Sequence, residues 1–277
     1  MTMRASVSGW LSLVVGVALA GVMACGFAFG AGMRQATAVR AAGQIRVDGA
    51  LNEKEWELEA WNGDFTSSSA GAENVGDPRR ADVQTRFKVL CDEQAVYVAV
   101  QCDEPNGDKI VARTTERDGT IWADDCVEVF FDPENDGRYY HQVMVNSKGV
   151  VYDSYSADYG LVHSRLWNGA FRAAGRVDAA AKQWTVEVQI PFSAIVLGEK
   201  AGSAWRWNVT RERHAGGRLE LTSWSPLKRN FHEPRLFGVL TGLPSDYAPF
   251  RFALAEPKVS VSRAGSGVAE LSLSVKV

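Results

Sequence analysis

Residues 120–149, TIWADDCVEVFFDPENDGRYYHQVMVNSKG, decide how the rest of this 277-residue sequence is interpreted. Apolar and polar residues alternate from Val127 to Phe131 and again from His141 to Val145. A period of two over such runs predicts strands with one face in a core and the other face toward something polar. The turn-forming sequence DPENDG lies between the two runs and predicts that they pair as a β-hairpin.

The polar face of this hairpin carries residues that are typical of sugar recognition. Glu128, Gln142 and Asn146 are expected on one surface, and Trp122 stands at the entrance to it. The CH face of a sugar stacks on an aromatic ring, while its hydroxyls take carboxylate or amide partners. The hairpin therefore indicates a carbohydrate site.

Further short alternating segments flank the hairpin on both sides. They cover residues 81–91, 95–102, 150–159, 172–177, 183–190, 205–211, 219–224 and 231–240. Many short strands separated by turn residues predict an all-β fold, an antiparallel β-sandwich of the jelly-roll or immunoglobulin type with short helical turns. No GxGxxG, Walker or HExxH pattern occurs.

Bulk composition narrows the class of partner. A net charge of −3 gives no reason to expect nucleic acid or an anionic membrane surface as a partner. Nine Trp residues exceed what a core of this size needs. Because the indole is amphipathic and enriched at recognition surfaces, we expect about two of them on a binding face.

The N-terminus has the features of an export segment. Arg4 is its positive start, residues 10–24 are apolar, and residues 28–30 give a small-x-small cleavage site. Residues 22–25, VMAC, also resemble a bacterial lipobox, which would place a lipid on Cys25, and the uncharged run is long enough for an uncleaved anchor. All three alternatives predict a secreted or cell-envelope location, with membrane contact only through this segment.

The sequence divides into four expected segments. Residues 1–30 are the signal peptide, 31–43 a small and polar tether, 44–243 the sandwich, and 244–277 a linker or the start of a further β domain. Outside the signal, Cys91, Cys102 and Cys126 show neither CxxC spacing nor clustered His. We therefore expect buried thiols rather than a zinc site.

Seven motifs, in order along residues 44–243, together resemble carbohydrate-binding module family 9. The motifs are IRVDGALNEKEW (45–56), FKVLCDEQAVYVAV (87–100), IWADDCVEVFFDP (121–133), HQVMVNSKG (141–149), WTVEVQIPFSAI (184–195), WRWNVTRER (205–213) and TSWSP (222–226). Members are β-sandwiches usually attached to xylanases and other secreted polysaccharide-active proteins. The resemblance implies a slot in which two Trp hold a terminal sugar, with catalysis left to an attached or partner glycoside hydrolase, for example a domain beyond residue 277.

The resemblance assigns the two stacking platforms to Trp122 and Trp224, and a hydroxyl acceptor to Glu128. Asn146 is expected on the polar face that carries Glu128. Arg211 is favoured for bidentate hydrogen bonding, with Asn208 in reserve, because the two lie on opposite faces of one regular strand.

The resemblance also implies a metal site and raises the question of which end of the polysaccharide is bound. Family members are described as binding calcium, and the acidic turn offers oxygen ligands at Asp132, Asn135 and Asp136, with a solvated turn as the alternative. No other cofactor is implied. Met144 stands where the best-known members present a basic residue, so selectivity for a reducing end does not follow for this chain.

Two other functions compete with sugar binding. A haem-binding, electron-carrying domain of the related DOMON-like type needs axial ligands, and His141 and Met144 fall on opposite strand faces. A glycoside hydrolase needs two carboxyls roughly 5–9.5 Å apart across a cleft, and no second acid on a distant strand accompanies residues 124–128. We therefore favour a non-catalytic module that binds a polysaccharide or oligosaccharide.

Overall fold

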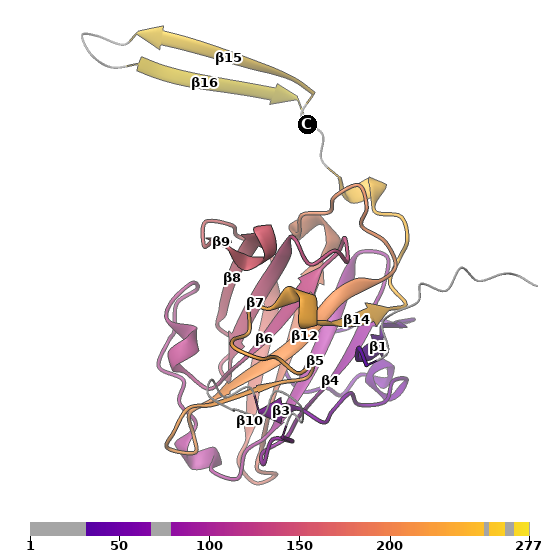
Figure 1. The fold of residues 1–277 in the computed structure, drawn as a ribbon, viewed down its shortest axis with the longest axis vertical. Coiled ribbons are helices and arrows are strands. Elements are labelled where there is room, and N and C mark those ends of the chain that lie inside the picture. The colour runs from indigo at the N-terminus through magenta and orange to yellow at the C-terminus, as the bar shows by residue number, and fades with distance from the viewer. Residues whose placement is uncertain (1–31, 68–78, 252–254, 264–268, 277) are drawn as a thin grey trace, which may run out of the picture. The chain divides into compact units, whose positions relative to one another are not determined.

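The computed structural model describes residues 32–67, 79–251, 255–263 and 269–276, and nearly all of its regular structure is short β-strand (Figure 1). Within these ranges the helical segments are single 3-10 turns, none long and apolar enough to cross a membrane. The predicted all-β sandwich is confirmed. The export segment, residues 1–30, lies outside the described residues.

The larger sheet has nine strands, in the order β1-β14-β12-β6-β7-β8-β9, with β13 pairing to β12 and β3 to β13. The strands are β1 (Gln35–Thr37), β3 (Thr66–Ser67), β6 (Cys126–Asp132), β7 (Tyr140–Asn146), β8 (Val151–Ala157), β9 (Val162–Ser164), β12 (Trp205–Arg213), β13 (Glu220–Ser223) and β14 (Gly238–Thr241). The predicted hairpin is β6–β7, which pair antiparallel with Glu128 opposite Met144.

The smaller sheet has five strands, in the order β10-β11-β5-β4-β2. They are β2 (Val39–Arg40), β4 (Thr85–Cys91), β5 (Ala95–Asp103), β10 (Arg172–Asp178) and β11 (Gln183–Pro191). The hairpin predicted from residues 81–102 is β4–β5, joined by a tight turn in which Asp92 accepts hydrogen bonds from the backbone of Gln94 and Ala95.

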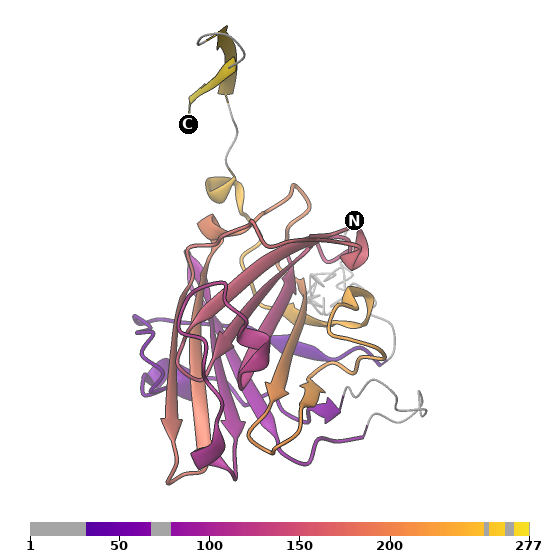
Figure 2. The ribbon, with the colours of Figure 1, turned by 90° about the vertical axis from the view of Figure 1, so that its left-hand side faces the viewer.

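The two sheets pack face to face (Figure 2) because alternate residues of their central strands are apolar. β6 contributes Val127, Val129 and Phe131 to the shared core, and β5 contributes Val98 and Val100. All five are fully buried. The even-numbered residues of β6 consequently point to the opposite, outer face of the larger sheet.

The prediction of a tether over residues 31–43 is wrong in part. β1 pairs in parallel with β14, and β2 pairs in parallel with β4, so the chain passes from one sheet to the other within a few residues. Ala36 and Ala38 are buried in the shared core. Small side chains allow this close passage, and they also hide the strands from a search for alternating hydrophobic residues.

The C-terminal boundary of the sandwich also differs from the prediction. Tyr247 is fully buried and its ring packs against Phe192 and Trp205, so the segment placed in the linker still contributes to the core. Farther along, β15 (Ala255–Arg263) and β16 (Ala269–Lys276) pair antiparallel with each other.

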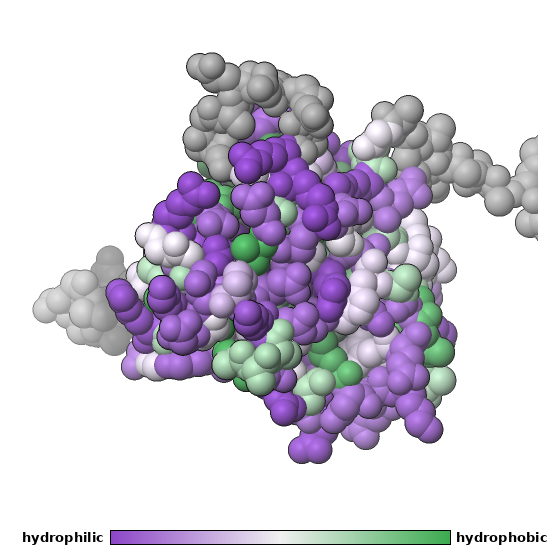
Figure 3. All heavy atoms as spheres, turned by 90° about the horizontal axis from the view of Figure 1, so that it is seen from below, coloured by the Kyte–Doolittle hydropathy of each residue, from purple (hydrophilic) through white to green (hydrophobic). Residues whose placement is uncertain are grey.

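The three expected buried thiols are confirmed, because Cys91, Cys102 and Cys126 are free and buried. Burial raises the pKa of each. The face of the molecule seen in Figure 3 is mostly hydrophilic, with apolar residues in small separate groups. Binding sites must therefore be sought in local hollows of the surface rather than in a broad apolar patch on that face.

Candidate binding site

A pocket of about 330 Å³ opens on the outer face of the larger sheet. Its floor comes from four neighbouring strands, and the residues are Glu212 of β12, Glu128 of β6, Met144 of β7 and Tyr152 of β8. Glu128 lies opposite Met144, and Met144 lies opposite Tyr152, so these side chains are cross-strand neighbours on one face. The period of two in the sequence therefore places them together.

Trp122 forms one wall of this pocket. It lies in a single 3-10 turn, η3 (Ile121–Ala123), and 36% of its surface is exposed. Tyr152 meets the indole edge-on with ring centres 5.8 Å apart, and the guanidinium of Arg165 lies 5.2 Å from the ring centre. A supported but partly open indole is suited to stacking on a sugar.

Asp124, two residues after Trp122, fixes the turn that carries the indole. Its carboxylate accepts hydrogen bonds from the backbone N–H of Arg113 (2.8 Å) and Thr114 (3.0 Å) and from Asn146 Nδ2 (3.0 Å). Burial acts to raise the pKa of Asp124, but these hydrogen bonds outweigh it and hold the pKa below its ordinary value. Trp122 is thus positioned by a fully engaged buried carboxylate rather than by a flexible loop.

Glu128 is a buried carboxylate in the pocket floor with one oxygen left over. Gln142 Nε2 donates to Glu128 Oε2 at 2.6 Å, and Ser154 Oγ donates to Gln142 Oε1 at 2.9 Å. Among the described residues no permanent donor reaches Oε1 of Glu128, because its neighbour there is the carboxyl of Glu212, which donates only when it is protonated. Because an unpaired buried oxygen is costly, it is a natural acceptor for a donor supplied from the pocket.

Glu212 is a second carboxyl in the same floor. Burial raises the pKa of Glu128 well above its ordinary value, and the charge of Glu212 raises it further. Burial also raises the pKa of Glu212, to about 7. Two neighbouring carboxyls in a poorly solvated site do not both ionise readily, so the pair keeps a proton near neutral pH. With that proton the pair offers both a donor and acceptors to a ligand's hydroxyls.

The segment after β13 forms the remaining wall, with Phe231 and His232 among its pocket-lining residues. His232 Nδ1 and the Tyr140 hydroxyl lie 2.8 Å apart, and the His232 ring packs edge-on against His163. Burial lowers the pKa of His232 to about 4, helped by His163. The imidazole is neutral near pH 7, which suits a ligand without charge.

The model of the family described as "Carbohydrate family 9 binding domain-like" matches residues 47–243. The chain belongs to this family of carbohydrate-binding modules. The family is one of binding domains rather than of catalytic ones. No curated protein matches the sequence.

Three solved structures share the fold of this family 9 module. A family 9 carbohydrate-binding module from Caldicellulosiruptor kristjanssonii, in complex with glucose, has a TM-score of 0.54 at 16% identity, over 78% of this chain and 98% of its own. A family 9 module from the same organism, in complex with cellotriose, has a TM-score of 0.53 at 17% identity, over 80% of this chain and 100% of its own. A protein from Bacteroides uniformis has a TM-score of 0.57 at 17% identity, over 76% of this chain and 99% of its own. At such identities the likeness shows the fold alone.

The structure does not place Trp224 of the module beside Trp122. Trp224 is 3% exposed and belongs to the core between the sheets, where it meets Phe87 edge-on with ring centres 5.2 Å apart. A Cβ added to Gly238 would lie only 2.5 Å from a Trp224 ring atom, so the backbone of β14 packs directly on the indole. The expected pair of indole walls is therefore corrected, since Trp224 points inward as β13 ends.

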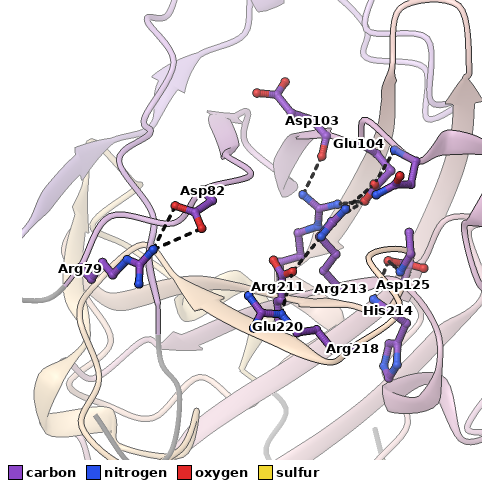
Figure 4. Close-up of polar contacts among 12 residues, drawn as sticks. Arg79, Asp82, Asp103, Glu104, Asp125, Arg211, Arg213, His214, Arg218 and Glu220 are labelled. Carbon is purple, nitrogen blue, oxygen red and sulfur yellow. Dashed lines mark hydrogen bonds and ion pairs between the residues drawn. The ribbon is translucent and has the colours of Figure 1, made fainter. Parts of the chain in front are cut away.

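Arg211 also points away from the pocket, into the space between the sheets (Figure 4). Its Nη2 lies 2.9 Å from Glu104 Oε2, and its Nη1 donates to the Asp103 carbonyl oxygen at 2.9 Å. Arg213 reaches the same carboxylate, with its Nε 2.7 Å from Glu104 Oε2. The prediction that Arg211 contacts ligand is corrected, because this buried ion cluster fastens β12 to the end of β5.

Asn146 and Asn208 are fully buried and support the module's walls. The Asn146 Nδ2 group donates to Asp124 and to the Thr114 carbonyl oxygen, while its Oδ1 accepts from two backbone N–H groups. Asn208 exchanges hydrogen bonds with the backbone N–H and carbonyl of Ser225, and so anchors the segment that leads to Phe231. Both predicted ligand contacts are corrected to positioning roles.

The turn predicted as a calcium site uses Asp132 for its own backbone. Its Oδ1 accepts from the N–H groups of Glu134 and Asn135, and its Oδ2 accepts from that of Gly137 at 2.6 Å. Burial raises the pKa of Asp132 to about 6. In the described ranges no three His, Cys, Asp or Glu side chains gather as a metal site. The turn, including Asp136, is thus explained without a metal, and calcium stays a prediction of the resemblance.

Glu212 is the residue that sequence reasoning missed. It lies two residues beyond Thr210, which is paired with Glu128, and both belong to the outer face of β12. The alternation along β12 does predict the face of Glu212, because Glu212 lies on the same strand face as Asn208. Its proximity to Glu128, however, depends on the pairing of strands that are far apart in sequence.

Proposed function

We propose that this protein is a non-catalytic module that holds the terminal sugar of a polysaccharide or oligosaccharide in the pocket above Glu128. One observation carries the proposal: the exposed indole of Trp122 stands over a buried carboxylate with an unpaired oxygen, on the outer face of a family 9 sandwich. Sugar binding by the family 9 module from Caldicellulosiruptor kristjanssonii supports this ligand class.

In this proposal the sugar ring stacks on Trp122 and its hydroxyls meet the carboxyl pair. Glu128 is held in one orientation by Gln142, so it loses little side-chain freedom on binding. Phe231, which lines the same pocket, supplies the second aromatic contact in place of Trp224. One aromatic stack contributes on the order of 1 kcal/mol beyond area burial, which suits a micromolar rather than a nanomolar complex.

The proposed role is to bring a partner or attached glycoside hydrolase to its polysaccharide outside the cell. The export features of residues 1–30 support this location. A neutral sugar suits this pocket, because Met144 adds no cation to the floor and the lining arginines are engaged elsewhere, Arg165 over the Trp122 ring and Arg229 with Glu233.

The test is calorimetric titration of the purified protein with glucose, xylose, cellobiose and cellotriose. Trp122→Ala is expected to weaken the affinity for the sugar that binds by at least about tenfold, or about 1.4 kcal/mol. The matched control is Tyr159→Ala, because Tyr159 is 43% exposed but does not line this pocket. Wild-type affinity in Trp122→Ala, or an equal loss in both variants, would reject the stacking site.

A further inference from the structure

Trp61 is a second indole that the proposed site leaves unexplained. Among the described residues, only Trp61 and Trp122 are exposed tryptophans, at 37% and 36%. Trp61 does not line the pocket above Glu128. It packs instead on β4 of the smaller sheet, where Arg86 and Lys88 lie 5.3 Å and 4.8 Å from its ring centre. An exposed indole held by two cations is a fixed platform rather than a loose surface side chain.

A hollow of about 390 Å³ adjoins this indole, with a polar lining that includes Gln101, Gln183 and Thr185. The polar groups form one connected row across β4, β5 and β11. Arg86 donates to Gln101 at 2.8 Å, Gln101 donates to Gln183, and Gln183 donates to Asp103 at 3.1 Å. Amides held in place beside an aromatic ring are the groups that hydroxyl-rich ligands need.

The far wall of the hollow is a strained loop with its own internal support. Leu51, which lines the hollow, has a φ of +53°, a conformation rarely adopted by a residue with a side chain of this size. Buried Glu187 holds the loop by accepting hydrogen bonds from the N–H groups of Asp48 (2.9 Å) and Gly49 (2.6 Å) and from Trp56 Nε1 (3.0 Å). Such strain persists only where surrounding contacts over-determine the backbone, and it is concentrated at functional sites.

The lining of the hollow carries one cation and one anion, and the two cations beside the indole are engaged within the protein. Arg176 and Asp178 both line it. Lys88 donates to the carbonyl oxygen of Trp56, and Arg86 is committed to Gln101. Because the charges of Arg176 and Asp178 balance, the lining has no net positive charge that would favour a uronic acid polymer, and a neutral ligand fits better. The polar lining is half-exposed rather than buried, which suits a chain lying across the sheet better than a chain end held in a closed pocket.

We infer that the outer face of the smaller sheet, around Trp61 and the amides of Gln101 and Gln183, is a second carbohydrate-binding surface that takes the interior of a neutral polysaccharide chain. The ligand class rests on the proposed function, whereas the surface stands on its own contacts. Two sites on one module add avidity on a polymer that neither site shows with a short sugar.

The test compares the full protein with Trp61→Ala, Gln101→Ala and Trp122→Ala in affinity gel electrophoresis. The gels contain hydroxyethyl cellulose, xylan or, as the anionic probe, polygalacturonate, and cellotriose titration reports separately on the pocket above Glu128. Trp61→Ala and Gln101→Ala are each expected to weaken retention on a neutral polymer by about three- to tenfold, the effect of losing one aromatic stack or one hydrogen bond. In the Trp122→Ala background, adding Trp61→Ala is expected to remove the remaining retention.

The two proposals fail in different ways. Wild-type retention of both Trp61→Ala and Gln101→Ala on the neutral polymers overturns the second surface, even when Trp122→Ala loses cellotriose. A loss of retention confined to polygalacturonate also overturns it, because it would assign an anionic ligand. Unchanged cellotriose affinity in Trp122→Ala rejects the first site without affecting the second. Because Gln101→Ala alters the same surface without touching the indole, misfolding of Trp61→Ala alone leaves the test decisive.

Discussion

Neighbouring residues of β12 serve the two faces of the larger sheet in opposite ways. Arg211 points to the inner face, where its guanidinium reaches Glu104 and a backbone carbonyl oxygen. Glu212 points to the outer face, where it shares the pocket floor with Glu128. The inner charge is neutralised by a counter-ion within the protein. The outer pair has no cation in the floor and reduces its charge by keeping a proton.

This difference separates structural polar residues from residues that are ready for a ligand. A buried polar group whose atoms all have partners contributes to stability, whereas a buried atom without a partner beside a pocket is available to something that enters. Asn146 belongs to the first class and Glu128 to the second, although both are fully or almost fully buried. Residue type and burial alone do not distinguish them.

The largest expected effect contrasts the inner indole with the outer one. Trp224→Ala removes a ring packed on Phe87 and on the β14 backbone, so we expect a loss of about 3–5 kcal/mol in the free energy of unfolding. Trp122→Ala is expected to change it by only about 1 kcal/mol, because its indole is partly exposed and loses chiefly its contacts with Tyr152 and Arg165. Urea denaturation measures both. A Trp224→Ala protein with normal stability that fails only to bind sugar would restore the two-indole slot.

A smaller effect is expected from exchanging an inner arginine. Arg211→Met removes a charged hydrogen bond to Glu104 but leaves Arg213 on that carboxylate, so we expect a loss of about 2 kcal/mol. The counterpart is Arg165→Met, since Arg165 is an exposed pocket-lining arginine over Trp122. It should leave stability unchanged and alter sugar affinity. If Arg211→Met alters sugar affinity while stability is retained, the assignment of Arg211 to a structural role on the inner face is wrong.

Much of the fold could be predicted from the sequence because the strands alternate. Period two identified β4 with β5 and β6 with β7, and it put Glu128 and Gln142 on one face. It failed where alternation is absent or brief. β1 and β2 contain two or three residues each, and their small side chains give no apolar pattern to detect.

The candidate site was harder to predict because a side chain's role depends on partners distant in sequence. Trp224 stands at a strand end, where alternation no longer fixes direction, and a backbone hydrogen bond to Val209 places it over the core. Asn146 was expected to face a ligand, but a segment more than twenty residues earlier in the chain supplies the acceptors for its amide N–H groups. Such contacts are set by tertiary packing, so the sequence predicts the face on which a residue lies and not its partners.

The smallest expected effect concerns the shared proton of the outer face. Because burial raises the pKa of Glu212 from 4.5 to about 7, the folded protein holds this proton more tightly than the unfolded chain. The stabilising contribution is complete below about pH 4.5 and is lost as the pH rises through about 7. Glu212→Gln should therefore become relatively more stable than the wild type over this range, by on the order of 1 kcal/mol, because part of Glu212 is solvated.

The difference between the two proteins isolates this effect from the histidines. Burial lowers the pKa of His141 to about 3 and that of His232 to about 4, so their contributions are lost as the pH falls below 6.5, the opposite direction. Both proteins contain these histidines, so their contributions cancel when thermal melts at pH 5 and pH 8 are subtracted. Glu116→Gln, at an exposed carboxylate, serves as the matched control. Parallel pH curves for wild type and Glu212→Gln would mean that Glu212 titrates as an ordinary surface carboxylate, and that the floor of the pocket meets its ligand without a shared proton.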